Sequence, residues 1–141
     1  MKYKTEEQAM EHVRLGERFI NKTFDSFRDN KRVVLEAVGI KGYALNGASD
    51  KLKDDKQVVL KAVKNYGYAI QFASDRLKAD KEVAYWALKE NIGSTAFFHK
   101  SLLQEIGDLD PMKFLDSFML KNTLEKSLTN NQDFKKQSGK I

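Results

Sequence analysis

Few residues of this sequence have the types and the spacing that catalysis or metal binding needs. The two histidines, His12 and His99, lie far apart, and neither belongs to a metal-binding pattern such as His-Glu-x-x-His. The chain contains no cysteine, which excludes a thiolate nucleophile, a disulfide framework and a cysteine-based zinc site. Gly42 and Gly67 are single, periodic glycines rather than a phosphate-binding loop. We expect neither a metal ion nor a cofactor.

Serines and paired acids are the remaining candidates for catalysis. Ser49 and Ser74 occupy equivalent places in a repeat, and a nucleophile would need a base and an oxyanion site beside it. The acid pairs Asp54-Asp55 and Asp108/Asp110 fall where helices are predicted to begin, and carboxylates at such positions cap free N–H groups. We expect no catalytic residue and no enzymatic activity.

These residues lie in a segment of about 25 residues that repeats along the chain. Val33-Val34-Leu35 recurs as Val58-Val59-Leu60, and Gly42-Tyr43-Ala44 recurs as Gly67-Tyr68-Ala69. In the third unit we infer one extra residue. Gly93 then aligns with Gly67, Leu103 with Leu77, and Phe97 with the polar position of Asn46 and Gln71. The predicted repeat domain spans residues 1–128, with a degenerate unit 5–28, units 29–53, 54–78 and 79–104, and a capping helix 110–128; a polar basic tail, 129–141, should be disordered.

Each unit is predicted to be a hairpin of two helices. The apolar residues at 58, 59, 62, 63 and 66 form one stripe of a helix, which an acid such as Asp55 caps. We expect first helices over 31–41 and 56–66, ended by Gly42 and Gly67 in the left-handed conformation, and second helices from Tyr43 to Leu52 and over 68–77. Because so short a hairpin cannot bury its apolar face alone, the all-α fold should be a small solenoid or a compact bundle of these units.

The repeat resembles a family known as a domain of unknown function, the one numbered 4116. Residues 55–80 fit its pattern almost throughout, residues 30–54 fit closely, and the likeness fades towards residue 103. Such repeats occur, often in tandem, in large proteins of intracellular bacteria, in protists and in viruses or phages, and no catalytic residue is attached to them. The resemblance implies a helical repeat fold and adds a bacterial effector or a phage-encoded inhibitor to the roles considered.

Composition sets further limits on the chain. The single proline and eight glycines, with 41% hydrophobic residues, are typical of a folded helical domain rather than a β-sandwich. We find neither a signal peptide nor an apolar stretch long enough to span a membrane, and we expect a cytoplasmic protein, in its own cell or in a host. The net charge of +5 allows an acidic partner without requiring one, and the oligomeric state is left open.

Two aromatic residues are candidates for contact with a protein partner. Trp86, the only tryptophan, occupies the position of Glu36 and Lys61, and Phe97 is assigned to a position that is polar in the earlier units. A position that is charged in two units should face water in the third, so Trp86 and Phe97 could anchor a protein. The alternative, which we favour, is that the C-terminal helix with Phe114 and Phe118 folds over them.

A set of basic residues recurs from unit to unit and could instead follow a phosphate backbone. This basic ladder consists of Lys31, Lys51, Lys53, Lys56, Arg76, Lys78 and Lys81. Acids such as Asp54 and Asp80 lie beside it, which favours an ordinary solvated face. The leading hypothesis is therefore a non-catalytic protein-binding module; the alternative is a module that binds nucleic acid or nucleoprotein through the ladder and the tail.

Overall fold

The described part of the chain is helical. The computed structural model describes residues 4–15 and 26–138, which contain no strand. The elements are, in order, α1 (Glu6–Arg14), α3 (Lys31–Ile40), η1 (Gly42–Gly47), α4 (Asp50–Lys53), α5 (Lys56–Asn65), η2 (Gly67–Phe72), α6 (Asp75–Lys78), α7 (Lys81–Glu90), η3 (Ile92–Phe97), α8 (Lys100–Ile106) and α9 (Pro111–Ser138), where η marks a 3₁₀ helix. The prediction of an all-α repeat fold with a C-terminal helix is confirmed.

A ten-residue α-helix opens each of the three clear units, and α3 and α5 each end one residue before the predicted bound. In α5, the Asp55 side chain accepts a hydrogen bond from the Val58 N–H at 3.2 Å and so caps the helix. Four residues of its apolar stripe, Val58, Val59, Ala62 and Val63, are completely buried. Full burial of a valine side chain contributes about 1.5–3 kcal/mol, so this stripe is what attaches the helix to its neighbours.

The second half of each unit is not the single helix that we expected. A 3₁₀ helix comes first, and after a break at Ser49 or Ser74 the four-residue helices α4 and α6 follow. The serine backbone is extended there, and its hydroxyl oxygen accepts the N–H of Leu52 or Leu77, three residues on. A serine that satisfies a free N–H in this way starts a new helix, which is why the chain breaks at this point.

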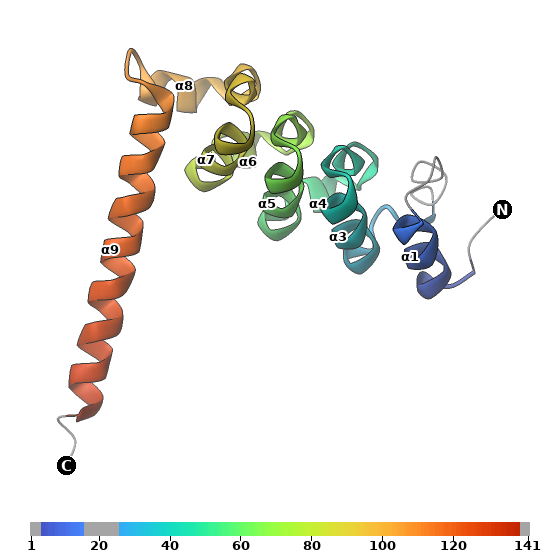
Figure 1. The fold of residues 1–141 in the computed structure, drawn as a ribbon, viewed down its shortest axis with the longest axis horizontal. Coiled ribbons are helices and arrows are strands. Elements are labelled where there is room, and N and C mark those ends of the chain that lie inside the picture. The colour runs from blue at the N-terminus through green and yellow to red at the C-terminus, as the bar shows by residue number, and fades with distance from the viewer. Residues whose placement is uncertain (1–3, 16–25, 139–141) are drawn as a thin grey trace.

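The units form a solenoid, the first of the two architectures that we considered. Helices α3, α5 and α7 lie side by side in one row, and the 3₁₀ helices η1, η2 and η3 contact one another in a second row (Figure 1). Helix α1 packs on α3 in the same way, with Ala9 and Val13 buried at the positions of Val34 and Val38. The part of the degenerate unit between residues 16 and 25 lies outside the described residues.

The third unit keeps the 25-residue spacing, so our alignment with one extra residue was wrong. Helix η3 starts at Ile92 where η2 starts at Gly67, and the His99 N–H bonds the Lys78 carbonyl as the Ser74 N–H bonds that of Lys53. Leu102, not Leu103, is the buried leucine at the position of Leu77, at 1% exposure against 41%. Phe97 therefore occupies the position of Phe72.

Gly42 and Gly67 are required by packing and not by backbone conformation. Gly107 is the glycine with positive φ in the described chain, so our assignment of Gly42 and Gly67 to the left-handed region was wrong. A Cβ on Gly67 would lie 2.5 Å from the Ala87 carbonyl oxygen of the next unit, and one on Gly42 would collide with the Ala62 carbonyl in the same way. The glycines thus let the 3₁₀ helix of one unit approach the long helix of the next.

The C-terminal helix is longer than predicted. Helix α9 begins at Pro111 as expected and packs against α7 with Leu115 fully buried, but it continues to Ser138 instead of ending near residue 128. No proline or glycine interrupts residues 112–138, so nothing stops the helix before the segment predicted as a disordered tail. Its second half projects from the stack (Figure 1), with every side chain from 123 to 137 exposed. None of the helices in the described ranges is long and apolar enough to cross a membrane.

We expect Gly67→Ala to destabilise the stack by about 1–3 kcal/mol, because its methyl group must displace the next unit's backbone. Ile92→Ala is the matched control, since Ile92 holds the same repeat position but is 82% exposed, and it should change stability by less than about 0.5 kcal/mol. Urea unfolding of both variants measures the difference. Equal stabilities for the two variants would contradict this account of the glycine.

Candidate functional site

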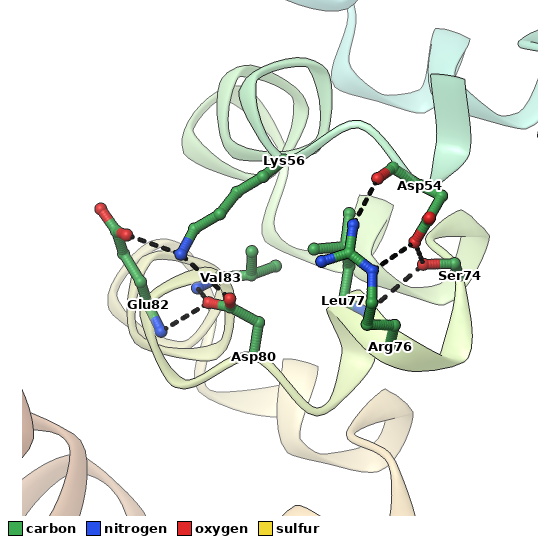
Figure 2. A network of polar contacts seen from close by, with 8 residues as sticks. All are labelled: Asp54, Lys56, Ser74, Arg76, Leu77, Asp80, Glu82 and Val83. Carbon is green, nitrogen blue, oxygen red and sulfur yellow. Dashed lines mark hydrogen bonds and ion pairs between the residues drawn. The ribbon is translucent and has the colours of Figure 1, made fainter. Parts of the chain in front are cut away.

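The lysines at the start of the three unit helices are ion-paired between units. Lys31 and Lys56 contact the acids that cap the next long helices, α5 and α7, and Lys81 contacts Glu105 near the end of α8. Figure 2 shows the contacts of Lys56. The pairs are Lys31 with Asp55 at 2.8 Å, Lys56 with Asp80 and with Glu82, both at 2.9 Å, and Lys81 with Glu105. These three members of the basic ladder are therefore neutralised by contacts that hold the stack together.

Arg76, a fourth member of the ladder, belongs to a second contact, which joins α6 to Asp54 at the end of α4. Its Nε lies 3.0 Å from a carboxylate oxygen of Asp54, and its terminal N–H donates to the Asp54 carbonyl at 2.7 Å (Figure 2). The Ser74 hydroxyl donates to the same carboxylate. The Ser74 hydrogen bond, followed by that from Arg76, holds the pKa of the Asp54 carboxyl below its usual 3.8.

The other three ladder lysines lie on the short helices. Lys51 and Lys53 belong to α4 and Lys78 to α6, and none of them forms an ion pair within the described ranges. The short helices contact α5 and α7, so these lysines lie beside the start of each long helix. The seven ladder residues thus alternate with carboxylates and do not form a continuous positive stripe.

Three candidates for catalysis, Ser74, His99 and Asp110, each cap a helix. Ser74 donates to Asp54 and caps α6, and His99 caps α8 with its Nδ1 accepting the Ser101 N–H at 3.2 Å. His12 is exposed on α1. Across residues 4–15 and 26–138, histidine and acidic side chains form no group of three that could hold a metal ion.

Trp86 lies half-buried at the edge of a surface hollow of about 270 Å³. The hollow is lined by Lys64 of α5 and by Trp86, Lys89 and Glu90 of α7. The Nζ of Lys64 lies 4.3 Å from the centre of the Trp86 ring and that of Lys89 lies 5.2 Å from it, while Tyr85 packs edge-on against the indole. The indole is thus held in place and remains accessible at the surface.

Phe97 lies elsewhere and has a different role from the one we expected. Its ring packs edge-on against Tyr68, with the ring centres 5.8 Å apart. Phe72 packs in the same way against Tyr43 at 5.1 Å, one unit earlier. The aromatic residue at this position therefore packs one 3₁₀ helix against the preceding one. Phe97 stabilises the stack and lies outside the candidate contact site.

The phenylalanines of α9 do not lie over Trp86, as our favoured alternative required. Both rings instead approach the Lys81 ammonium group at the start of α7, with centres 5.8 Å away for Phe114 and 5.2 Å for Phe118. They line a separate hollow of about 510 Å³ that also includes Leu109. Trp86 lies further along α7, against the preceding helix α5.

Sequence reasoning did not single out three lysines of α5 and α7: Lys64 and Lys89 lie against Trp86, and the end of the Lys61 side chain lies against Gly39 of α3. Lys61 is the equivalent of Trp86 in the preceding unit, and Lys64 and Lys89 share another repeat position. The repeat alignment contains this signal only in the last two units, because the first unit has Glu36 and Gly39 at these positions. We call Lys61, Lys64, Trp86 and Lys89 the tryptophan–lysine patch.

Comparison with known proteins gives one result. A family model described as a domain of unknown function (DUF4116) matches residues 30–78 and residues 55–103, which together cover just over half of the chain. Both ends of the second match lie 25 residues beyond those of the first, in agreement with the spacing seen in the structure. No curated protein and no solved structure matches the chain.

The contacts of Lys56 predict how stability depends on pH. Burial favours its neutral form, but hydrogen bonds to Glu82 and Asp80 outweigh burial and raise the pKa of Lys56 above its usual 10.5. A raised pKa gives stability that is fully present below pH 10.5 and is lost as the pH rises through the folded pKa. Because the pair is partly exposed, Lys56→Gln should cost about 0.2–1 kcal/mol at neutral pH.

Denaturant unfolding of the wild type and of Lys56→Gln, repeated from neutral to alkaline pH, measures this contribution. The difference between the two proteins should shrink above pH 10.5, whereas Lys51→Gln should match the wild type at every pH because Lys51 forms no ion pair in the described chain. A Lys56 effect that stayed constant through the alkaline range would contradict an ionic origin.

Proposed function

The chain belongs to the family of the domain of unknown function DUF4116, and from this premise we propose that it is a non-catalytic helical repeat module that binds another protein. Its setting is the cytoplasm, of the producing cell or of a host cell, in the role of an effector or a phage-encoded inhibitor. The partner contacts the later units of the stack, on the edge where α5 and α7 present Lys64 and Trp86.

The observation that carries the proposal is the placement of Trp86. The same repeat position holds Glu36 in the first clear unit, where its carboxylate pairs with Arg14 at 2.8 Å, and Lys61 in the second. Two units therefore fold with a charged side chain at this position, on the solvent-exposed edge of the stack. Folding does not require a tryptophan there. Tryptophan, when half-exposed in a hollow, is among the residues that contribute most to protein–protein binding.

The ion pairs of the basic ladder favour a protein partner over nucleic acid. A protein that follows a phosphate backbone offers unpaired cations at regular intervals, and each phosphate contact steepens the dependence of affinity on salt. Lys31, Lys56, Arg76 and Lys81 are already paired with carboxylates, so phosphate would have to replace those contacts. Binding of nucleic acid through the ladder and the C-terminal segment is therefore the second candidate.

The wild type should capture a partner protein even after nuclease treatment of the lysate. We expect Trp86→Ala to abolish this capture. The measurement is a pull-down from lysate of the producing or host cell with wild type and variant, and circular dichroism checks that the variant is folded. Trp86→Lys is a second variant, because it places the residue of the preceding unit at this position and should not disturb packing.

Phe134→Ala is the matched control, since Phe134 is 73% exposed on α9, away from Trp86. It should capture as much partner as the wild type does. The proposal fails if both Trp86 variants retain the partner, and a capture that disappears with nuclease and survives the Trp86 variants would favour the nucleic-acid candidate.

A further inference from the structure

The lysines beside Trp86 differ from those at the other end of the same helices. Lys31 and Lys56 each contact a carboxylate of the next unit, and Lys81 contacts Glu105 near the end of α8. Lys61, Lys64 and Lys89 form no ion pair in the part of the chain that the structure describes, although Lys61 and Lys64 lie one turn apart on α5. Lys64 and Lys89 therefore place unneutralised positive charge against the single tryptophan, and Lys61 adds positive charge on the side of α3.

One acid lines the hollow, and it is already engaged. Glu90 accepts the Gly67 N–H with its carboxylate, as Asn65 does for the Gly42 N–H one unit earlier at 2.6 Å. Glu90 thus serves the contact between units. With Lys64 and Lys89 lining the hollow and Lys61 one turn away, the patch keeps an excess of positive charge that an incoming carboxylate would meet.

The patch is restricted to the last two units. One unit earlier, the position of Lys61 is occupied by Glu36, which pairs with Arg14, and the position of Lys64 is Gly39. Neighbouring helices of a stack lie about 8–10 Å apart, and the three ammonium groups lie between Gly39 of α3 and Trp86 of α7, so they span about two helix spacings of a bound chain. A ligand extending towards the first units would meet an acid instead of a further lysine.

We propose that the tryptophan–lysine patch binds a short acidic segment of the partner protein, an inference that rests on the proposed protein-binding function. Carboxylates of the segment pair with Lys61, Lys64 and Lys89, and an apolar side chain of the segment packs in the hollow against Trp86. Nucleic acid fits this patch less well, because two ammonium groups already lie against the indole that a base would stack on, and the charge does not continue along the stack.

Trp86 itself provides the measurement, because it is the only tryptophan of the chain. We would titrate the full chain at low salt with a short oligo-glutamate peptide containing one leucine, and follow the tryptophan emission. Saturable change is expected, and replacing Lys61, Lys64 and Lys89 together by glutamine should weaken the apparent affinity at least about tenfold, because the variant loses the charge attraction to the carboxylates of the peptide. An oligo-lysine peptide of the same length should give no saturable change.

The matched control replaces Lys51, Lys53 and Lys78 by glutamine, which removes the same charge from lysines beside the start of the long helices. This control should bind the peptide like the wild type. The inference is overturned if the peptide leaves the emission unchanged, if both triple variants weaken binding equally, or if oligo-thymidylate binds the patch more tightly than the peptide.

Partner capture separates this inference from the proposed function. If the Trp86 variants lose the captured protein while the variant lacking Lys61, Lys64 and Lys89 keeps it in full, the chain binds protein but the partner segment is not acidic. If capture does not depend on Trp86 at all, both the proposed function and the acidic segment are overturned.

Discussion

The stack depends on the close approach of each 3₁₀ helix to the long helix of the next unit. At Gly42 and Gly67 the backbone comes so near a carbonyl of the next long helix that only a hydrogen fits on Cα. The N–H of Gly42 donates to the side chain of Asn65, and that of Gly67 donates to Glu90, each near the end of the same long helix. This contact sets the distance between units. The lysine–carboxylate pairs and the buried valine stripes then join the same neighbours at the same spacing.

The same constraint explains where the repeats end and why the last units differ. Ile92 holds the glycine position in the third unit, where its side chain is exposed and would block a further unit in this register. Helix α9 packs against α7 instead, with Leu115 in the core and its phenylalanines at Lys81. Its contacts leave Trp86 accessible, so the end of the stack is also where the surface departs most from the repeat pattern.

The sequence predicts the parts of this fold that depend on periodicity, and misses those that depend on close packing. The apolar stripe and its caps identified α3 and α5 within one residue, because burial and capping act locally. The role of Gly67 could not be inferred, since a glycine that ends a helix and one that lets backbones approach look alike without coordinates. For the same reason we aligned Gly93 with Gly67, although Ile92 holds that position in the structure. Trp86 could be identified because charged residues at its position in two other units indicate that the position faces water.

Native-state hydrogen exchange of the glycine amides tests most directly the claim that docking between units organises the protein. Gly42 and Gly67 begin short 3₁₀ helices, where local opening would ordinarily be frequent, yet their N–H groups bond to the next unit. The account predicts that both exchange only when the stack unfolds, whereas the Gly93 amide, bonded to Asn91 of its own unit, exchanges by local opening. Exchange of Gly42 and Gly67 as fast as that of Gly93 would contradict it.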